Sequence, residues 1–267
     1  RSGKEREGMD YDILLARGQS TPQERKTLRL QGMARHGAQV HTLSADVSNK
    51  EEMDKVLSYC VQRCGGLDGV IHAAGDTRRE AIVNAIAETP SEHCPDVFLA
   101  KVRGTRVLKE ALADFAARHA DMQPEFCFMI SSNAATLGGM GLSAYASASA
   151  FLDAFAEQEN KHGKTTWISS NWDGWPTEQS TGQELAFATS IDRFALSLEE
   201  CVEAFEKILA LACSQVIVSR ETLQRRIDKW LGSPHSGDHR GKCETDAQMN
   251  SEIAQTQALE PKSRNPK

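Results

Sequence analysis

The chain has 267 residues, of which 40% are hydrophobic and 25% charged, and its formal net charge is −6. These values fit one large or two small globular domains and exclude a disordered, collagen-like or coiled-coil chain. The negative charge argues against a protein that binds nucleic acid or a membrane surface. No apolar run reaches the roughly 18 residues of a membrane span, and the charged N-terminus has no apolar stretch typical of a signal peptide.

The seven cysteines are scattered and odd in number. This favours a reducing compartment over a disulfide framework, so we expect a cytoplasmic protein. Cys60 and Cys64 lie four positions apart on a predicted helix, a spacing that places two thiolates on one helix face, where they could bind zinc. No second Cys or His pair lies nearby, so we interpret both as ordinary free thiols and predict no metal site.

Hydrophobic periodicity and helix-end signals predict alternating strands and helices along most of the chain. Strands are predicted over 11–16, 39–45, 70–75, 126–130, 166–170 and 215–219, and helices over 20–37, 48–65, 91–119, 144–161, 198–211 and 221–231. Ser48 and Glu51 have the spacing of a capping box, and Gly37 and Gly65 suit helix ends.

This alternation predicts an α/β fold, a Rossmann-like, doubly wound parallel sheet with ligands bound outside the carboxyl ends of its strands. After Gly232 the character changes, because residues 233–267 contain few large apolar side chains and many polar ones. Such a segment buries too little surface to offset its ordering entropy, so we interpret it as a flexible linker or tail.

A serine, a tyrosine and a lysine form the strongest chemical pattern. Ser132 ends a predicted strand, and Tyr145 follows thirteen positions later at the start of a helix, after a glycine-rich loop. A phenol with its ordinary pKa of about 10 is a poor acid at neutral pH unless a cation lowers that pKa. Lys101 is the candidate cation. A tyrosine activated by a lysine, with a serine that polarises a carbonyl, is typical of carbonyl reduction.

Six stretches form a more specific pattern, over 45–47 (Ala-Asp-Val), 69–75 (Gly-Val-Ile-His-Ala-Ala-Gly), 100–105 (Ala-Lys-Val-Arg-Gly-Thr), 130–132 (Ile-Ser-Ser), 144–153 (Ala-Tyr-Ala-Ser-Ala-Ser-Ala-Phe-Leu-Asp) and 171–175 (Asn-Trp-Asp-Gly-Trp). In this order they resemble the ketoreductase (KR) domain of modular polyketide synthases, a member of the short-chain dehydrogenase/reductase superfamily. The resemblance spans the predicted domain over 11–232 and leaves residues 1–10 as a segment outside the family pattern.

The resemblance implies that the domain reduces a β-ketoacyl thioester, held on an acyl carrier protein, to its β-hydroxyacyl form. Tyr145 would donate the proton, Ser132 would orient the substrate carbonyl, and Lys101 would lower the tyrosine pKa and hold the nicotinamide ribose. The fourth catalytic position of the family, four residues after the tyrosine, is an asparagine, whereas this chain has Ser149 there. A serine hydroxyl has fewer donors and a shorter reach.

The same resemblance implies NADP(H) as the cofactor. Arg17 would meet the 2′-phosphate, Asp46 and Val47 would line the adenine pocket, and the small residues Ala73, Ala74 and Gly75 would lie beside the cofactor. Family members begin with a strand, a Gly-x-Gly-x-x-Gly-type turn and a helix that binds the pyrophosphate. Residues 1–10 have no such motif, so we expect the sheet of this chain to lack its first β-α unit.

Two functions remain open at this point. The first is an NADPH-dependent reductase that works with an acyl carrier protein and neighbouring synthase domains. The second is a non-catalytic ketoreductase-like scaffold or docking domain within a polyketide megasynthase. The absent glycine motif and Ser149 favour the second, whereas the Ser132, Tyr145 and Lys101 pattern favours the first.

Overall fold

The structure is a computed structural model that describes residues 22–76, 97–175, 194–211 and 213–231. The chain forms two compact units, residues 1–45 and residues 46–267. The strand predicted over 11–16 and the tail predicted over 233–267 lie outside the described residues.

The first unit contains the predicted helix, α2 (Pro22–Arg35). Gly37 follows with a φ of +89°, a left-handed conformation that favours glycine, and its N–H donates to the Ala34 carbonyl at 3.0 Å. The prediction of a strand over 39–45 is wrong, because these residues form a loop without strand pairing. Within the described residues no neighbouring strand pairs with it, and Val40 and Leu43 are exposed. An apolar run becomes a strand only where a neighbour completes its backbone hydrogen bonds.

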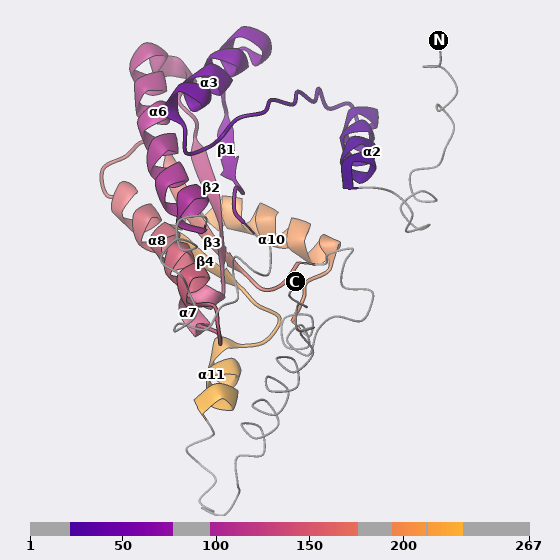
Figure 1. The fold of residues 1–267 in the computed structure, drawn as a ribbon, viewed down its shortest axis with the longest axis vertical. Helices are drawn as coiled ribbons and strands as arrows, with labels where there is room; N and C mark the ends of the chain where they lie inside the picture. The colour runs from indigo at the N-terminus through magenta and orange to yellow at the C-terminus, as the bar shows by residue number, and fades with distance from the viewer. Residues whose placement is uncertain (1–21, 77–96, 176–193, 212, 232–267) are drawn as a thin grey trace, which may run out of the picture. The chain divides into compact units, whose positions relative to one another are not determined.

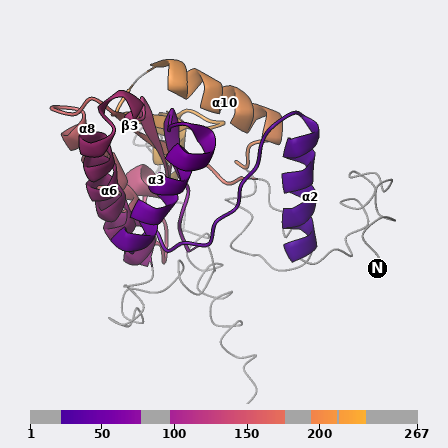
Figure 2. The same cartoon turned by 90° about the horizontal axis from the view of Figure 1, so that it is seen from above.

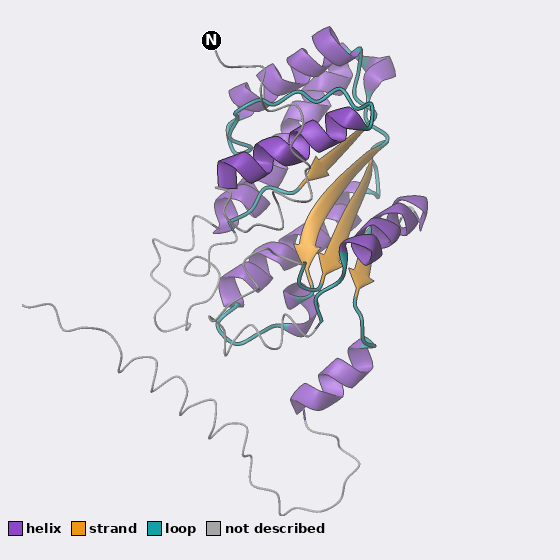
Figure 3. Cartoon of the chain, turned by 90° about the vertical axis from the view of Figure 1, so that its right-hand side faces the viewer, coloured by secondary structure: helices purple, strands orange, loops and turns teal. Residues whose placement is uncertain are grey.

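The second unit is built on a four-stranded sheet with the order β1-β2-β3-β4 (Figure 3). The strands are β1 (Gly69–His72), β2 (Phe126–Ser132), β3 (Thr166–Trp172) and β4 (Gln215–Val218), and every neighbouring pair is parallel. The predicted parallel α/β sheet is therefore confirmed. All carboxyl ends point to the same edge, where a ligand site is expected in such sheets.

Helices join these strands in the way that parallel pairing requires (Figure 1). Their bounds are α3 (Lys50–Cys64), η2 (Leu99–Gly104), α6 (Thr105–Arg118), η3 (Ala120–Met122), α7 (Ala134–Leu137), α8 (Ser143–Glu159), α10 (Leu198–Leu211) and α11 (Leu223–Leu231). None of the helices in the described part of the chain has both the length and the apolar character that a membrane crossing needs.

The start of α3 corrects the predicted capping box. The cap is Asn49, whose side chain accepts from the backbone N–H groups of Glu51 and Glu52, whereas Ser48 donates to the Asp46 carboxylate. Asparagine is at least as good a cap as serine, so the helix begins one residue later. The predicted end is confirmed, because Gly65 adopts a left-handed φ of +81°.

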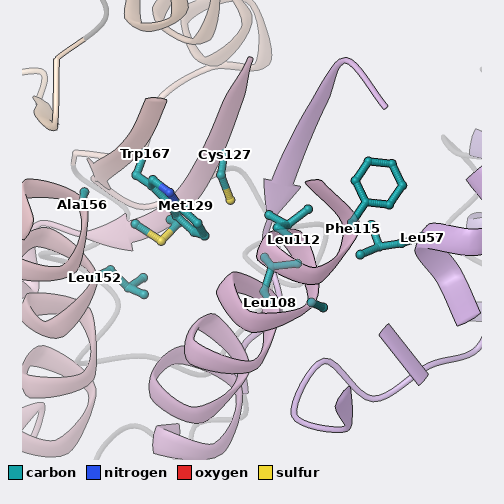
Figure 4. Packing of buried hydrophobic residues seen from close by; sticks show 10 residues of the cluster. Leu57, Leu108, Leu112, Phe115, Cys127, Met129, Leu152, Ala156 and Trp167 are labelled. Atoms are coloured by element: carbon teal, nitrogen blue, oxygen red, sulfur yellow. The ribbon is translucent and has the colours of Figure 1, made fainter. Parts of the chain in front are cut away.

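Two hydrophobic clusters cover the two faces of the sheet, as a doubly wound fold requires. On one face, α3, α6 and α8 pack on β2 and β3 through Leu57, Leu108, Leu112, Phe115, Cys127, Met129, Leu152, Ala156 and Trp167 (Figure 4). On the other face, Cys201 and Ile208 of α10 pack with Phe128 and Ile168 of the sheet, and Figure 2 shows α10 on the side opposite to α6 and α8. Burial of these apolar surfaces supplies the main driving force for the fold.

Strand β1 lies at the edge of the described sheet and is only partly covered. Among the described strands it pairs with β2 alone. Its Ile71 is 56% exposed, although its register partner Phe128 is fully buried beneath α10. The cover supplied by α10 therefore stops before β1.

We predict that Gly69→Ala destabilises the fold, because Gly69 pairs directly with Phe126 across the β1–β2 ladder. A methyl group at Gly69 would lie 2.3 Å from the Phe126 ring. Overpacking of this kind costs about 1–3 kcal/mol of the free energy of unfolding, measurable by denaturant titration. Gly66→Ala is the matched control, because its methyl group would meet only Met122 at 3.9 Å. Equal stability of the two variants would contradict the prediction.

Candidate active site

The three residues of the predicted catalytic set come from three elements around the carboxyl end of β2. Ser132 is the last residue of β2, Tyr145 lies in the first turn of α8, and Lys101 lies in η2. The ammonium Nζ of Lys101 is 5.3 Å from the centroid of the Tyr145 ring, and the Ser132 side chain lies close enough to the phenol to lower its pKa. The structure therefore brings the predicted serine, tyrosine and lysine together.

Lys101 is buried on a π-helical turn, an irregularity that is frequent at functional sites. The widened turn is held by Thr105, whose hydroxyl donates to the Lys101 carbonyl at 2.5 Å. The ammonium itself donates to the carbonyl oxygen of Ile130 at 2.7 Å, two residues before Ser132. Burial lowers the pKa of Lys101 to about 8, and the negative charge of Asp153 opposes that change.

Tyr145 is half-buried, and burial raises its pKa above the ordinary value, while the hydrogen bond from Ser132 opposes that rise. The phenol is therefore protonated throughout the neutral range, which is the form a proton donor needs. Ser132 also accepts from the backbone N–H of Ala134 at 3.2 Å, the first residue of α7. This contact helps to fix the serine hydroxyl at the strand end.

Ser149 lies one helical turn after Tyr145 and is fully buried. Among the described residues its hydroxyl oxygen has no hydrogen-bond partner, while its backbone carbonyl accepts from Ser131 at 3.1 Å. Ser149 therefore lies on the part of α8 that packs on β2, one turn after Tyr145. Its catalytic role stays a prediction.

The residues predicted to hold the cofactor divide into three groups. Ala73, Ala74 and Gly75 are exposed directly after β1, and a methyl group at Gly75 would lie 3.7 Å from Cε of Lys101. Asp46 is exposed and accepts from Ser48, and these hydrogen bonds lower its pKa. Val47 packs so closely on Gly104 that a methyl group there would lie 2.7 Å from Cγ1. Arg17 lies outside the described residues.

His72 is a buried base beside this site. Burial lowers its pKa to about 4, the positive charge of Lys101 adds to that effect, and its Nε2 has no hydrogen-bond partner in the described part of the chain. It is therefore neutral at pH 7. A neutral, buried imidazole at the end of β1 is typical of a core residue.

A polar network beneath the site has no counterpart in the sequence predictions. Asp153 of α8 accepts from Ser169 and Asn171 of β3 and from Gln215 of β4, and Asn171 also donates to the Ser132 carbonyl at 3.1 Å. The sequence signal was present, because three polar residues occur in succession at the end of a strand predicted to be buried. Buried polar side chains need partners, so such a run indicates a network.

A second polar contact joins the end of β3 to α11. Asp173 and Arg226 form an ion pair at 2.5 Å whose side chains are only 4% and 14% exposed. The Arg226 guanidinium also lies 4.4 Å from the centroid of the Phe194 ring and donates to Ser219 at 3.0 Å. This pair fixes the loop that follows β3, next to the site.

Within the described ranges, no group of three or more His, Cys, Asp or Glu side chains is arranged to hold a metal ion. Cys60 and Cys64 are free thiols, as are the other cysteines in the described part of the chain.

We predict that the burial of Lys101 makes stability depend on pH. Between about pH 8, where Lys101 of the folded protein loses its proton, and about pH 10.5, its ordinary value, the unfolded chain binds more protons. The free energy of unfolding therefore rises with pH across that window, and Lys101 contributes at most about 3 kcal/mol of this rise. Lys101→Met should remove this contribution, measured as a flatter dependence of denaturation on pH. Parallel curves for the two proteins would contradict the assigned burial.

We also predict that Arg226→Met destabilises the fold by about 3 kcal/mol, because it leaves the Asp173 carboxylate buried without its partner. Arg220→Met is the control, since Arg220 pairs with Glu200 at 3.0 Å but both side chains are at least 40% exposed. That variant should change the free energy of unfolding by less than about 1 kcal/mol. Similar losses in both variants would refute the distinction between the two pairs.

The chain is similar in sequence to known ketoreductase domains. Residues 6–177 match the family described as the KR domain. Polyketide synthase PksN of Bacillus subtilis (strain 168) is 29% identical over 225 residues, which cover 80% of this chain and 4% of PksN. The chain therefore spans only a small part of this relative.

Solved structures show the same fold. The crystal structure of a ketoreductase domain from the bacillaene assembly line matches with a TM-score of 0.63 and 26% identity, covering 82% of this chain and 54% of the other. A short-chain dehydrogenase from Streptomyces avermitilis matches with a TM-score of 0.57 over 88% of this chain and 86% of its own length, at 18% identity, which shows the fold alone. The chain thus has the short-chain dehydrogenase/reductase fold and belongs to the KR domain family, the ketoreductase domains of polyketide synthases.

Proposed function

We propose that this chain is the part of a polyketide synthase ketoreductase domain that holds the proton donor. The reaction is the NADPH-dependent reduction of a β-ketoacyl thioester on an acyl carrier protein to the β-hydroxyacyl form. Tyr145, Ser132 and Lys101 carry the chemistry. The partners are the acyl carrier protein and neighbouring synthase domains, in line with the polyketide synthases among the relatives.

The observation that supports this function best is the buried Lys101 beside Tyr145. Taking an ammonium group out of water costs several kcal/mol unless the group is paired, and among the described residues Lys101 donates to the Ile130 carbonyl alone. A scaffold that only packs or docks gains nothing from a lysine in this position. A reductase gains a cation 5.3 Å from the ring of its acid.

The described residues fit a nicotinamide at the carboxyl end of β1. Ala73, Ala74 and Gly75 are small and exposed, so they leave room for a flat ring beside Lys101. When bound, the nicotinamide supplies the hydride to the carbonyl carbon. Lys101 would hold the ribose through its ammonium, while Arg17, Asp46 and Val47 would contact the adenosine end.

The residues of the chain then handle the substrate oxygen. Ser132 donates a hydrogen bond to the carbonyl oxygen and so stabilises the negative charge that develops there. Tyr145 gives its proton to the same oxygen. The ammonium of Lys101 stabilises the phenolate that remains, an interaction that strengthens in a buried, water-poor site.

Ser149 takes the fourth position of this site. Its hydroxyl lies one turn from Tyr145, is fully buried and has no hydrogen-bond partner among the described residues. This burial limits any part of Ser149 in returning a proton to the tyrosine, because its oxygen is out of contact with solvent.

The direct test is turnover of a simple β-keto thioester with NADPH, followed by the loss of NADPH absorbance. We expect Tyr145→Phe to lower kcat by at least about 100-fold, because the proton donor is removed while the ring stays in place. Ser149→Ala should lower kcat less. It should leave the free energy of unfolding nearly unchanged, because no hydrogen bond is lost.

Tyr59→Phe is the control for the loss of a phenolic hydroxyl, because Tyr59 lies on α3 outside the site. It should keep full activity. Turnover that survives Tyr145→Phe would contradict the assigned acid. Failure to bind NADPH even at millimolar concentration, measured by calorimetry, would favour the scaffold function.

A further inference from the structure

Asp153 is the centre of the polar network between α8 and the sheet. Its Oδ1 accepts from the Ser169 hydroxyl at 2.6 Å, and its Oδ2 accepts from the Asn171 and Gln215 amides, both at 2.9 Å. Three donors to one carboxylate form strong, charge-assisted hydrogen bonds. The carboxylate therefore fixes the middle of α8 to β3 and β4.

The network reaches the site through one side chain. Asn171 is fully buried, and its amide donates both to Asp153 and to the backbone carbonyl of Ser132, at 3.1 Å. Tyr145 lies eight positions before Asp153 on the same helix, and the Ser132 side chain lowers its pKa. Asn171 therefore joins the helix that carries the phenol to the strand end that carries Ser132.

The opposite end of α8 has a comparable connection that does not reach the site. Asn160 donates to the Trp167 carbonyl at 2.7 Å and to Ser214 at 2.8 Å, and accepts from the Trp167 N–H at 2.8 Å. Both asparagine connections join α8 to β3. Only the one through Asp153 also binds the strand end that carries Ser132.

We propose that Asp153 is a positioning residue of this site, which sets the Tyr145 phenol relative to the Ser132 hydroxyl through hydrogen bonds relayed by Asn171. Asp153 does not touch the reacting groups. The inference rests on the proposed function only in taking Tyr145 as the acid. Small displacements of catalytic groups strongly lower reaction rates, so a network that fixes the Tyr145 phenol relative to the Ser132 hydroxyl would affect activity.

The test measures Tyr145 directly and needs no turnover. The chain has three tyrosines, so Tyr11→Phe together with Tyr59→Phe leaves Tyr145 as the sole phenol. Its ionisation is then followed by ultraviolet absorbance, with circular dichroism as the check on folding. The groups that face the phenol are the Lys101 ammonium from η2 and the Ser132 hydroxyl from β2. Lys101 loses its proton near pH 8, before the phenol ionises.

Four variants in this background separate the explanations. Asp153→Ala and Asn171→Ala both break the connection between α8 and the end of β2, so Ser132 is less well placed to lower the Tyr145 pKa, which should rise by about half a pH unit. Asp153→Asn keeps an acceptor for both amides and can donate to Ser169, so it removes the charge without the hydrogen bonds and should cause no rise. Asn160→Ala breaks the other connection and should also cause no rise.

Each alternative has its own outcome. No rise in Asp153→Ala and Asn171→Ala would overturn the proposal, and so would an equal rise in Asn160→Ala, which would indicate general loosening of α8. A rise in Asp153→Asn as large as that in Asp153→Ala would also overturn the proposal, because the amide keeps the hydrogen bonds and the loss of a negative charge lowers a phenol pKa. Where Asp153→Ala does not fold, Asn171→Ala and Asp153→Asn decide. The expected pattern in a protein without turnover would reject the proposed function and leave the positioning role intact.

Discussion

The burial of one ammonium group constrains the site more than any other interaction. A buried ammonium group needs a hydrogen-bond acceptor, and Lys101 finds one in the Ile130 carbonyl. This hydrogen bond forms only if η2 lies against the end of β2. The π-helical turn and the Thr105 hydroxyl supply the local geometry. The same placement sets the cation beside Tyr145, so folding and chemistry depend on one contact.

Features decided by local geometry were predictable from the sequence. The end of α3 at Gly65 and the main strands β2 and β3 follow from residues close together in the chain. The wrongly predicted strand over 39–45 has the same local sequence pattern. A strand also needs a neighbouring strand to pair with, and a local pattern does not say whether one is present. The cap at Asn49 instead of Ser48 reflects two adjacent residues that are both suitable caps.

The candidate site also contains residues that the sequence predicts and residues that only the assembled fold reveals. Resemblance pointed to Tyr145, Ser132 and Lys101, and the described structure brings them together. The family resemblance assigned no role to Asp153 or Asn171, although both lie inside the stretches that carry it. Their pairing depends on how α8 crosses β3 and on the register between β2 and β3, which places Asn171 opposite Ser131. Such long-range geometry appears only once the fold is assembled.

The buried thiol of Cys127 gives the protein an internal reporter. Cys127 lies in β2, is fully buried, and its pKa is strongly raised by that burial. A neutral, inaccessible thiol reacts with neither oxidants nor alkylating reagents. Its modification therefore requires β2 to separate from α6 and α8. Because β2 also carries Ile130 and Ser132, the rate of alkylation at this single sulfur measures how often the strand beneath the candidate site opens.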